Sequence, residues 1–152
     1  MKNDLLYKFL NKEYSIKELD SNNISTIFKG NNKVYLLIEN NKSIKLMIEK
    51  LLLELGIPSN LKGFTYLTEA IFLCLNDEKY TKDITKNLYP SIAQKMNIKD
   101  GNVEKNIRKA IEVGCTNTNP ELLEEIFGYS INIDKGKPTN SNYIYTIYNI
   151  LR

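Results

Sequence analysis

The sequence predicts a mainly α-helical fold, and three observations lead to this expectation. Apolar residues recur at helical spacing from Ser43 to the end of the chain. Runs rich in β-forming residues are confined to two short segments, 24–28 and 34–38. The length of 152 residues suits one ordinary domain with a small extension. We therefore expect a helical domain at 43–152, preceded by a small helix plus β-hairpin extension at 1–42.

The extension at 1–42 begins with two short helical signals, an apolar stripe and a capping box. The runs at 24–28 and 34–38 are separated by Gly30-Asn31-Asn32, and these residues supply the positive φ angles that a hairpin turn needs. An exposed strand edge of such a hairpin can pair with a second copy, so we predict a homodimer formed through the extension. The helical signals consist of Leu5, Leu6 and Leu10 for the stripe, and of Ser15 and Glu18 for the capping box.

Seven segments of the domain at 43–152 carry helical signals. The first segment is stopped by Gly56-Ile57-Pro58. Proline begins the fourth segment, and Asp100 is expected to cap the fifth. The last helix is expected to be capped by Thr139, Asn140 and Ser141. In order, the segments are 44–52, 67–75, 80–86, 90–96, 101–113, 120–126 and 141–151.

The composition argues against catalysis. Histidine is absent, so there is no Ser-His-Asp or Cys-His nucleophile pair and no zinc site of the usual histidine-containing kinds. The only cysteines, Cys74 and Cys115, are far apart and have no CxxC spacing, which excludes a cysteine-built metal site and a disulfide framework. Both are expected to behave as small core residues. We predict a protein that is not an enzyme and that uses no metal or other cofactor.

Nothing in the chain predicts export or membrane association. The first ten residues carry Asp4 and Lys8 within their apolar stretch and show no small-residue cleavage pattern. No apolar run approaches the roughly 20 residues that a membrane helix needs. Two unpaired cysteines suit a reducing interior. The sequence therefore predicts a cytoplasmic protein with no membrane association.

The charges are segregated along the helical domain. From Leu46 onward there are thirteen basic and thirteen acidic residues, so the net charge of +3 comes from the residues before it. Between Lys79 and Lys109 there are eight basic and three acidic residues, whereas 112–134 holds five acidic residues and no basic one. A neutral domain with a basic pole suits a protein that presents one face to nucleic acid.

The residues of the basic pole have a helix-turn-helix layout. A short helix with Ile92, Ala93 and Met96 turned inward is followed by a turn at 97–99. The next helix has apolar residues at i, i+4, i+7 and i+8, so one of its faces is expected to be buried. Its other face is polar and is expected to enter the major groove of DNA. The apolar positions are Val103, Ile107, Ala110 and Ile111; the polar positions are Asn102, Lys105, Asn106 and Lys109, with Glu104 and Arg108 at the flank.

Several stretches of the chain resemble one known family in the same order along the sequence. These stretches are Glu54-Leu55-Gly56-Ile57-Pro58, Leu61-Lys62-Gly63-Phe64, Tyr66-Leu67, Glu69-Ala70-Ile71, Ile84-Thr85-Lys86, Leu88-Tyr89-Pro90, Ile92-Ala93, Val103-Glu104, Ile107-Arg108, Ala110-Ile111-Glu112-Val113, Phe127-Gly128-Tyr129 and Lys137-Pro138-Thr139-Asn140-Ser141. By these residues the domain is similar, over about residues 44–152, to the DNA-binding effector domain of the stage-zero sporulation response regulator family.

The resemblance implies a six-helix effector domain that contains the helix-turn-helix and binds specific sequences of double-stranded DNA in transcriptional control. It places base contacts at Glu104, Lys105 and Arg108. Lys105 stands where the family has an arginine, and this exchange loses the planar fork suited to guanine. Asn102 and Lys109 likewise replace an arginine and a histidine. An altered DNA specificity is therefore expected.

The resemblance also bears on partners. The segment around Ile126 and Phe127 matches the region through which the family contacts the sigma factor of RNA polymerase. Family members usually carry a phosphate-accepting receiver domain before the effector, and the 43 or so residues before this domain are too few for one. We expect a relative without a receiver, controlled by a signal other than aspartyl phosphorylation.

The sequence-based hypothesis is a DNA-binding transcriptional regulator that inserts 101–113 into the major groove. Two alternatives stay open: a protein-interaction module that binds the sigma factor or antagonises a full-length sporulation regulator, and a plasmid or phage replication or partition protein that binds DNA. The predicted DNA-binding residues are Asn102, Glu104, Lys105, Asn106, Arg108 and Lys109 on the second helix, with Lys86, Lys95, Lys99, Lys135 and Lys137 around it.

Overall fold

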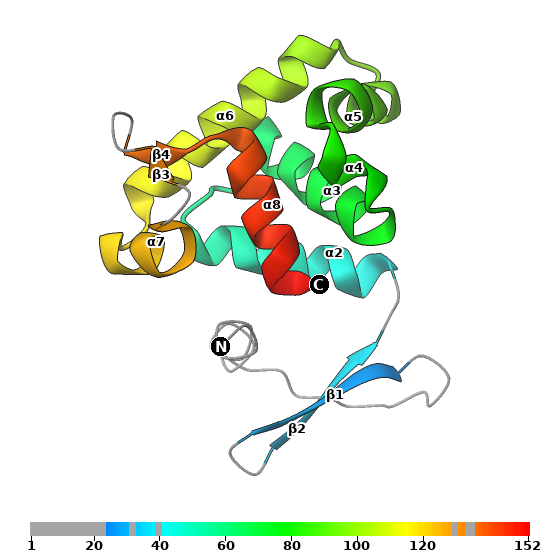
Figure 1. The fold of residues 1–152 in the computed structure, drawn as a ribbon, viewed down its shortest axis with the longest axis vertical. Helices are drawn as coiled ribbons and strands as arrows, with labels where there is room; N and C mark the ends of the chain where they lie inside the picture. Colours follow the sequence, from blue (N-terminus) through cyan, green and yellow to red (C-terminus); the bar gives the residue numbers. More distant parts are fainter. Residues whose placement is uncertain (1–23, 31–32, 39–40, 129–130, 133–135) are drawn as a thin grey trace.

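The computed structural model describes residues 24–30, 33–38, 41–128, 131–132 and 136–152. These residues form a mainly α-helical structure, as predicted (Figure 1). The two helical signals of the extension and the turn residues Asn31 and Asn32 lie outside the described residues. The extension as a whole, and its role in a homodimer, therefore stay predictions.

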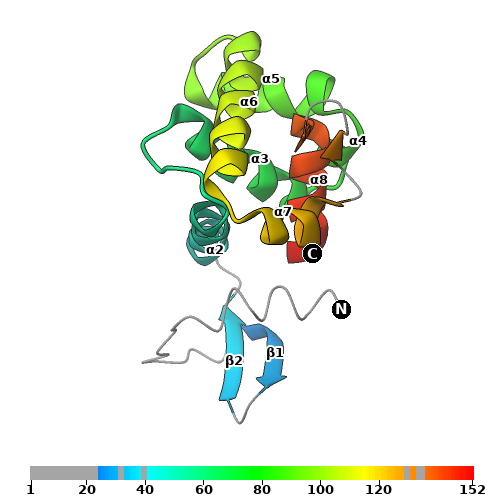
Figure 2. The same cartoon turned by 90° about the vertical axis from the view of Figure 1, so that its left-hand side faces the viewer.

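Two short antiparallel strand pairs accompany the helices. Strand β1 (Ile24–Gly30) pairs with β2 (Lys33–Ile38), with Gly30 opposite Lys33 and an irregularity in register between Ile24 and Thr26. Strand β3 (Ile131–Asn132) pairs with β4 (Lys137–Pro138). In both views β1 and β2 lie below the helices, next to α2 (Figures 1 and 2). Strand β4 contacts α8, and Lys137 in β4 reaches Glu112 in α6.

The described residues form seven α-helices and one π-helical turn, where the resemblance implied six helices. The additional element is the single turn α4, which comes from the predicted segment 80–86. Two aspartates divide this part of the chain: Asp77 Oδ1 accepts from the backbone N–H of Lys79 at 3.0 Å, and Asp83 Oδ1 accepts from that of Lys86 at 2.9 Å. The elements are α2 (Asn41–Glu54), α3 (Lys62–Asn76), α4 (Lys79–Lys82), the π-helical η2 (Ile84–Leu88), α5 (Tyr89–Met96), α6 (Asp100–Asn117), α7 (Pro120–Phe127) and α8 (Asn140–Leu151).

Helix α3 lies at the centre of the helical part and packs against α2, α6 and α8 (Figure 1). Of the stripe predicted for it, Leu67, Ala70 and Ile71 are buried and Leu75 is half-buried. Cys74 belongs to this core, as expected, and burial raises the pKa of its thiol to about 12. A thiol with this pKa stays protonated and unreactive at neutral pH.

Close backbone contacts fix the position of α6. A Cβ added at Gly63 would lie 2.0 Å from the carbonyl oxygen of Asn106, so α3 and α6 cross where only glycine fits. A Cβ at Gly114 would lie 2.6 Å from Ile57, in the loop after α2. In the same loop the carbonyl of Gly56 accepts from the side-chain amide of Asn117 at 2.9 Å. These loop contacts hold the last turn of α6, which extends beyond the predicted 101–113.

The α7–α8 contact contains a buried phenol with no hydrogen-bond partner in the described structure. The rings of Phe127 and Tyr143 are stacked with centroids 4.6 Å apart, and the Tyr143 hydroxyl is enclosed without a partner. Burial also raises the pKa of Tyr143, so the hydroxyl stays protonated. An unpaired buried hydroxyl keeps its desolvation cost without a compensating bond.

We expect Tyr143→Phe to raise the free energy of unfolding by about 1 kcal/mol, because it removes this unpaired group and keeps the ring. Urea denaturation measures the change. Tyr89→Phe is the matched control: the Tyr89 hydroxyl accepts a hydrogen bond from Asn140 at 3.1 Å, so its loss should lower the free energy of unfolding. A clear destabilisation by Tyr143→Phe would show that its hydroxyl has a partner.

Candidate nucleic-acid interface

Helices α5 and α6 form the predicted helix-turn-helix. Helix α5 ends at Asn97, whose positive φ of 53° turns the chain, and the backbone N–H of Ile98 donates to the carbonyl of Ala93 at 2.9 Å. The predicted cap of α6 is corrected: Lys99 is the N-cap residue and makes no side-chain cap bond, whereas Asp100 is the first helical residue. Its carboxylate there faces the positive end of the helix dipole.

Helix α6 has one buried and one exposed face, as predicted. Val103, Ile107, Ala110 and Ile111 are buried. Asn102, Lys105, Arg108 and Lys109 are exposed, and a Cβ added at Gly101 would meet nothing within 4 Å, so the first turn is open to solvent. Asn106 is half-buried, and its side-chain amide donates to the carbonyl of Asn102 at 2.7 Å. The exposed face therefore carries cations and amides that can reach a ligand, and Asn106 is held against its own helix.

Two of the predicted base-contacting residues form an ion pair with each other. A guanidinium nitrogen of Arg108 contacts the carboxylate of Glu104 one turn earlier. Both side chains are about half exposed, and surface pairs at this spacing are worth only a few tenths of a kcal/mol. The pair can therefore open at little cost when either side chain finds another partner. Lys105 and Lys109 have no ion-pair partner within the described residues.

The lysines predicted around α6 differ in exposure and in whether they form ion pairs. Lys99 is exposed, and Lys86 is exposed with its ammonium 3.8 Å from Asp83. Lys95 and Lys137 are engaged with carboxylates, each at 2.5 Å: Lys95 with Glu69 and Lys137 with Glu112. Lys135 lies outside the described residues.

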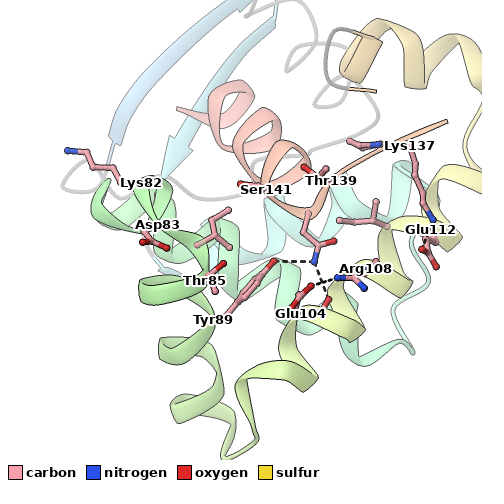
Figure 3. A pocket seen from close by; sticks show the side chains of 14 residues that line it. Lys82, Asp83, Thr85, Tyr89, Glu104, Arg108, Glu112, Lys137, Thr139 and Ser141 are labelled. Atoms are coloured by element: carbon pink, nitrogen blue, oxygen red, sulfur yellow. Dashed lines mark hydrogen bonds and ion pairs between the residues drawn. The ribbon is translucent and has the colours of Figure 1, made fainter. Parts of the chain in front are cut away.

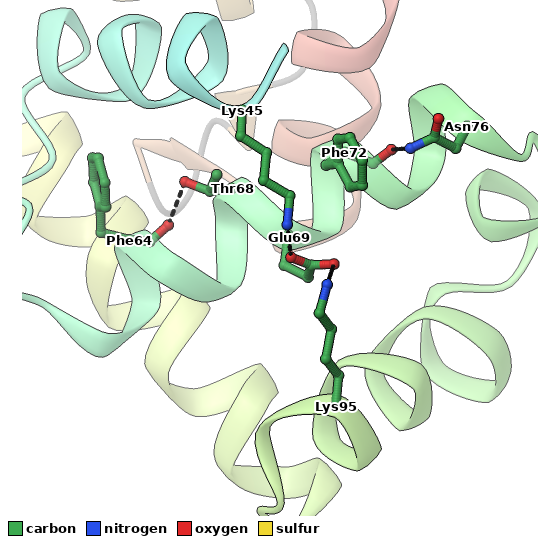
Figure 4. Close-up of polar contacts among 7 residues, drawn as sticks. All are labelled: Lys45, Phe64, Thr68, Glu69, Phe72, Asn76 and Lys95. Carbon is green, nitrogen blue, oxygen red and sulfur yellow. Dashed lines mark hydrogen bonds and ion pairs between the residues drawn. The ribbon is translucent and has the colours of Figure 1, made fainter. Parts of the chain in front are cut away.

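A buried carboxylate links the helix-turn-helix to the rest of the domain. The Glu69 side chain, in α3, is only 4% exposed and receives Lys45 from α2 at 2.7 Å and Lys95 from α5 at 2.5 Å (Figure 4). Lys45 also lies over the ring of Phe72, 4.5 Å from its centroid. Sequence reasoning missed this centre, although a glutamate between the apolar Leu67 and Ala70–Ile71 was a signal of a paired buried charge.

The Glu69 centre predicts a pH dependence of stability. Burial alone would raise the pKa of Glu69, but the hydrogen bonds and charges of Lys45 and Lys95 together outweigh it and place the pKa below its ordinary value of 4.5. A carboxyl with a lowered folded-state pKa contributes stability that is fully present above its unfolded pKa and is lost as the pH falls through the folded pKa.

We expect Glu69→Gln to lower the free energy of unfolding by about 2 kcal/mol at pH 7, because two charge-assisted hydrogen bonds are lost. The difference between variant and wild type should shrink as the pH falls below about 4.5, the unfolded pKa. Urea denaturation between pH 7 and pH 3 measures it. Glu121→Gln, at an exposed position of α7, is the control and should have little effect. A difference that is independent of pH would contradict the role of the ionised carboxylate.

A cleft of about 930 Å³ lies along one side of α6 (Figure 3). Its walls are α6, β4, the first turn of α8 and the turn between α4 and η2. Thr139 caps α8 as predicted, since its side chain accepts from the backbone N–H of Asn142 at 3.2 Å. The Asn140 side chain does not cap α8, because its amide contacts Tyr89 and Glu104 of the helix-turn-helix.

The sigma-factor contact expected at Ile126 and Phe127 stays a prediction, and both side chains lie on the buried side of α7. Ile126 is 9% and Phe127 1% exposed, because α7 turns them into the core. Apart from Pro120, the side chains that α7 exposes are acidic, among them Glu121 and Glu124. A partner of this helix would therefore meet carboxylates and not the two apolar residues.

Comparison with known protein families gives a match that covers the helix-turn-helix. Residues 48–151 match the family model described as "Sporulation initiation factor Spo0A C terminal". The chain belongs to this family. The Spo0A C-terminal domain is a non-enzymatic, DNA-binding effector domain that regulates transcription in sporulation. The match includes α5 and α6 entirely, so the helix-turn-helix lies within the Spo0A C-terminal domain.

Within the described ranges, no three or more histidine, cysteine, aspartate or glutamate side chains gather where a metal ion could bind. None of the helices in the described part of the chain is both long and apolar enough to cross a membrane.

Proposed function

We propose that this chain recognises a specific sequence of double-stranded DNA by placing the exposed face of α6 in the major groove. The observation that carries the proposal is the arrangement of that helix. Its buried face is fixed by α3 and α5, whereas its N-terminal half presents Asn102, Lys105 and Arg108 to solvent. Amide and cationic side chains pair with base edges and phosphates in the major groove.

Exposed lysines near the exposed face of α6 support its use as the DNA-binding surface. Lys99 at the start of α6 and Lys86 in η2 are exposed and have the charge that phosphates attract. Lys95 and Lys137 have carboxylate partners. Either lysine can contact DNA only if its ion pair opens or if its ammonium contacts the carboxylate and a phosphate at the same time. We therefore expect the affinity to depend mainly on α6 and its immediate flank.

The test is selection of bound sequences from a pool of random duplexes, followed by measurement of affinity at several salt concentrations. The proposal predicts enrichment of one sequence. The logarithm of the binding constant should fall linearly with the logarithm of the salt concentration, with a slope near −0.9 for each phosphate contact. If no sequence were enriched and the protein bound all duplexes with equal affinity, sequence-specific recognition would be contradicted.

A second candidate function is binding of a partner protein such as the sigma factor through α7. The exposed carboxylates of Glu121 and Glu124 favour it, since a cationic partner surface would be attracted to them. This function predicts that Glu121→Lys and Glu124→Lys weaken capture of the sigma factor and leave DNA affinity unchanged. Capture that survives both substitutions would remove α7 as the contact.

A further inference from the structure

The Asn140 side chain joins α8 to both helices of the helix-turn-helix. Its amide nitrogen donates to the Tyr89 hydroxyl, at the start of α5, and to the backbone carbonyl of Glu104, in the second turn of α6, both at 3.1 Å. The orientation of the amide follows from chemistry, because a backbone carbonyl accepts only and so must face the nitrogen. Both hydrogens of that nitrogen are thereby used.

The two acceptors are held firmly. Tyr89 is 6% exposed, so its hydroxyl is fixed by the packing of its ring. The carbonyl of Glu104 belongs to the part of α6 that carries the proposed base-reading residues, and the Glu104 carboxylate in turn contacts Arg108. Asn140, Tyr89, Glu104 and Arg108 therefore form one connected set along the wall of the cleft.

We propose that Asn140 is a positioning residue for DNA recognition: it sets the orientation of the N-terminal half of α6 relative to α5. The inference rests on the proposed function, because the benefit of a fixed α6 is the accurate placement of Lys105 and Arg108 against base edges. Sequence-specific contacts need accurate geometry, whereas phosphate attraction tolerates small displacements. Loss of the Asn140 amide should therefore weaken specific binding more than non-specific binding.

The experiment compares full-length wild type with Asn140→Ala, Asn140→Asp and Tyr89→Phe. Asn140→Asp keeps the shape and removes the donors. Ser141→Ala is the matched control, because Ser141 is the next residue of α8 and lines the same cleft, and its side chain makes no hydrogen bond to another described residue. Affinity is measured for the duplex selected from the random pool and for a duplex of equal length without the site, at one salt concentration.

We expect Tyr89→Phe, which removes one hydrogen bond, to lower specific affinity about fivefold to tenfold. Asn140→Ala and Asn140→Asp remove both hydrogen bonds of the amide and should lower specific affinity at least as much. Non-specific affinity should stay within about twofold for Asn140→Ala and Tyr89→Phe, and Ser141→Ala should change neither value. An equal loss of specific and non-specific affinity, or no loss for Asn140→Ala, would overturn the positioning role.

Hydrogen exchange of the free protein separates this inference from the proposed function. In an α-helix the amide of residue 108 donates to the carbonyl of residue 104, the group that Asn140 also contacts. Asn140→Ala should therefore speed exchange at 103–108 and leave 120–127 unchanged. If the wild type bound no duplex, the proposed function would be wrong, but hydrogen exchange would still test the positioning role of Asn140. Unchanged exchange at 103–108 in Asn140→Ala would refute that role.

Discussion

Gly63→Ala is expected to lower the free energy of unfolding by about 3 kcal/mol, at the upper end of the usual cost of overpacking. The added Cβ would lie 2.0 Å from the carbonyl oxygen of Asn106 and 2.6 Å from the Cβ of Ala110. The first neighbour is helix backbone, which cannot turn aside as a side chain can. The substitution must therefore separate α3 from α6 or prevent folding. Chemical denaturation monitored by circular dichroism measures the change.

The matched control is Gly101→Ala, in the first turn of α6. A Cβ there would meet nothing within 4 Å, and alanine favours helix over glycine by up to about 1 kcal/mol. This variant should be as stable as the wild type or more stable. If Gly63→Ala were as stable as Gly101→Ala, the close crossing of α3 and α6 would be wrong.

Arg108→Ala and Lys105→Ala are expected to reduce affinity for the selected duplex by about 1–3 kcal/mol each and to relax the preference at the base pair that each reads. Both side chains are exposed on α6, so neither loss should disturb the core. Arg108→Ala also removes the partner of Glu104, which is about half exposed and can be solvated by water. Repeating the selection with each variant shows which base pair loses its preference.

Lys50→Ala is the charge-matched control for these variants. Lys50 is exposed on α2, which lies away from the α5–α6 end in both views (Figures 1 and 2). Its loss should change affinity by no more than about twofold at physiological salt, where distant charges are largely screened. If Lys50→Ala weakened binding as much as Arg108→Ala, the effect would be one of net charge and not of contact.

The spacing of apolar residues predicted the helices that have no break within them. The segments 101–113 and 141–151 lie within α6 and α8, because their apolar spacing agrees with the packed structure, although α6 continues to Asn117. The segment 80–86 was predicted as one piece and is divided into α4 and η2. Its division depends on aspartate side chains that bind nearby backbone, and a periodicity of apolar residues does not detect these bonds.

Contacts between distant parts of the chain could not be predicted from spacing. Asn140 was expected to cap α8. It contacts Tyr89 and Glu104 instead, which lie 51 and 36 positions earlier in the chain. The pairing of Lys95 with Glu69 likewise depends on how α5 packs against α3. In contrast, the exposure of Asn102, Lys105 and Lys109 on α6 was predicted correctly, since burial of one face of a helix determines the other. Asn106, which was predicted on the same face, is half-buried.

The placement of α6 in the major groove is tested most directly by dimethyl sulfate footprinting on the selected duplex. The reagent methylates guanine N7, which lies in the major groove, and adenine N3, which lies in the minor groove. We predict protection of guanine N7 within the site, loss of that protection at one guanine with Arg108→Ala, and unchanged reactivity of adenine N3. Protection of adenine N3, with guanine N7 fully reactive, would contradict the proposed use of α6.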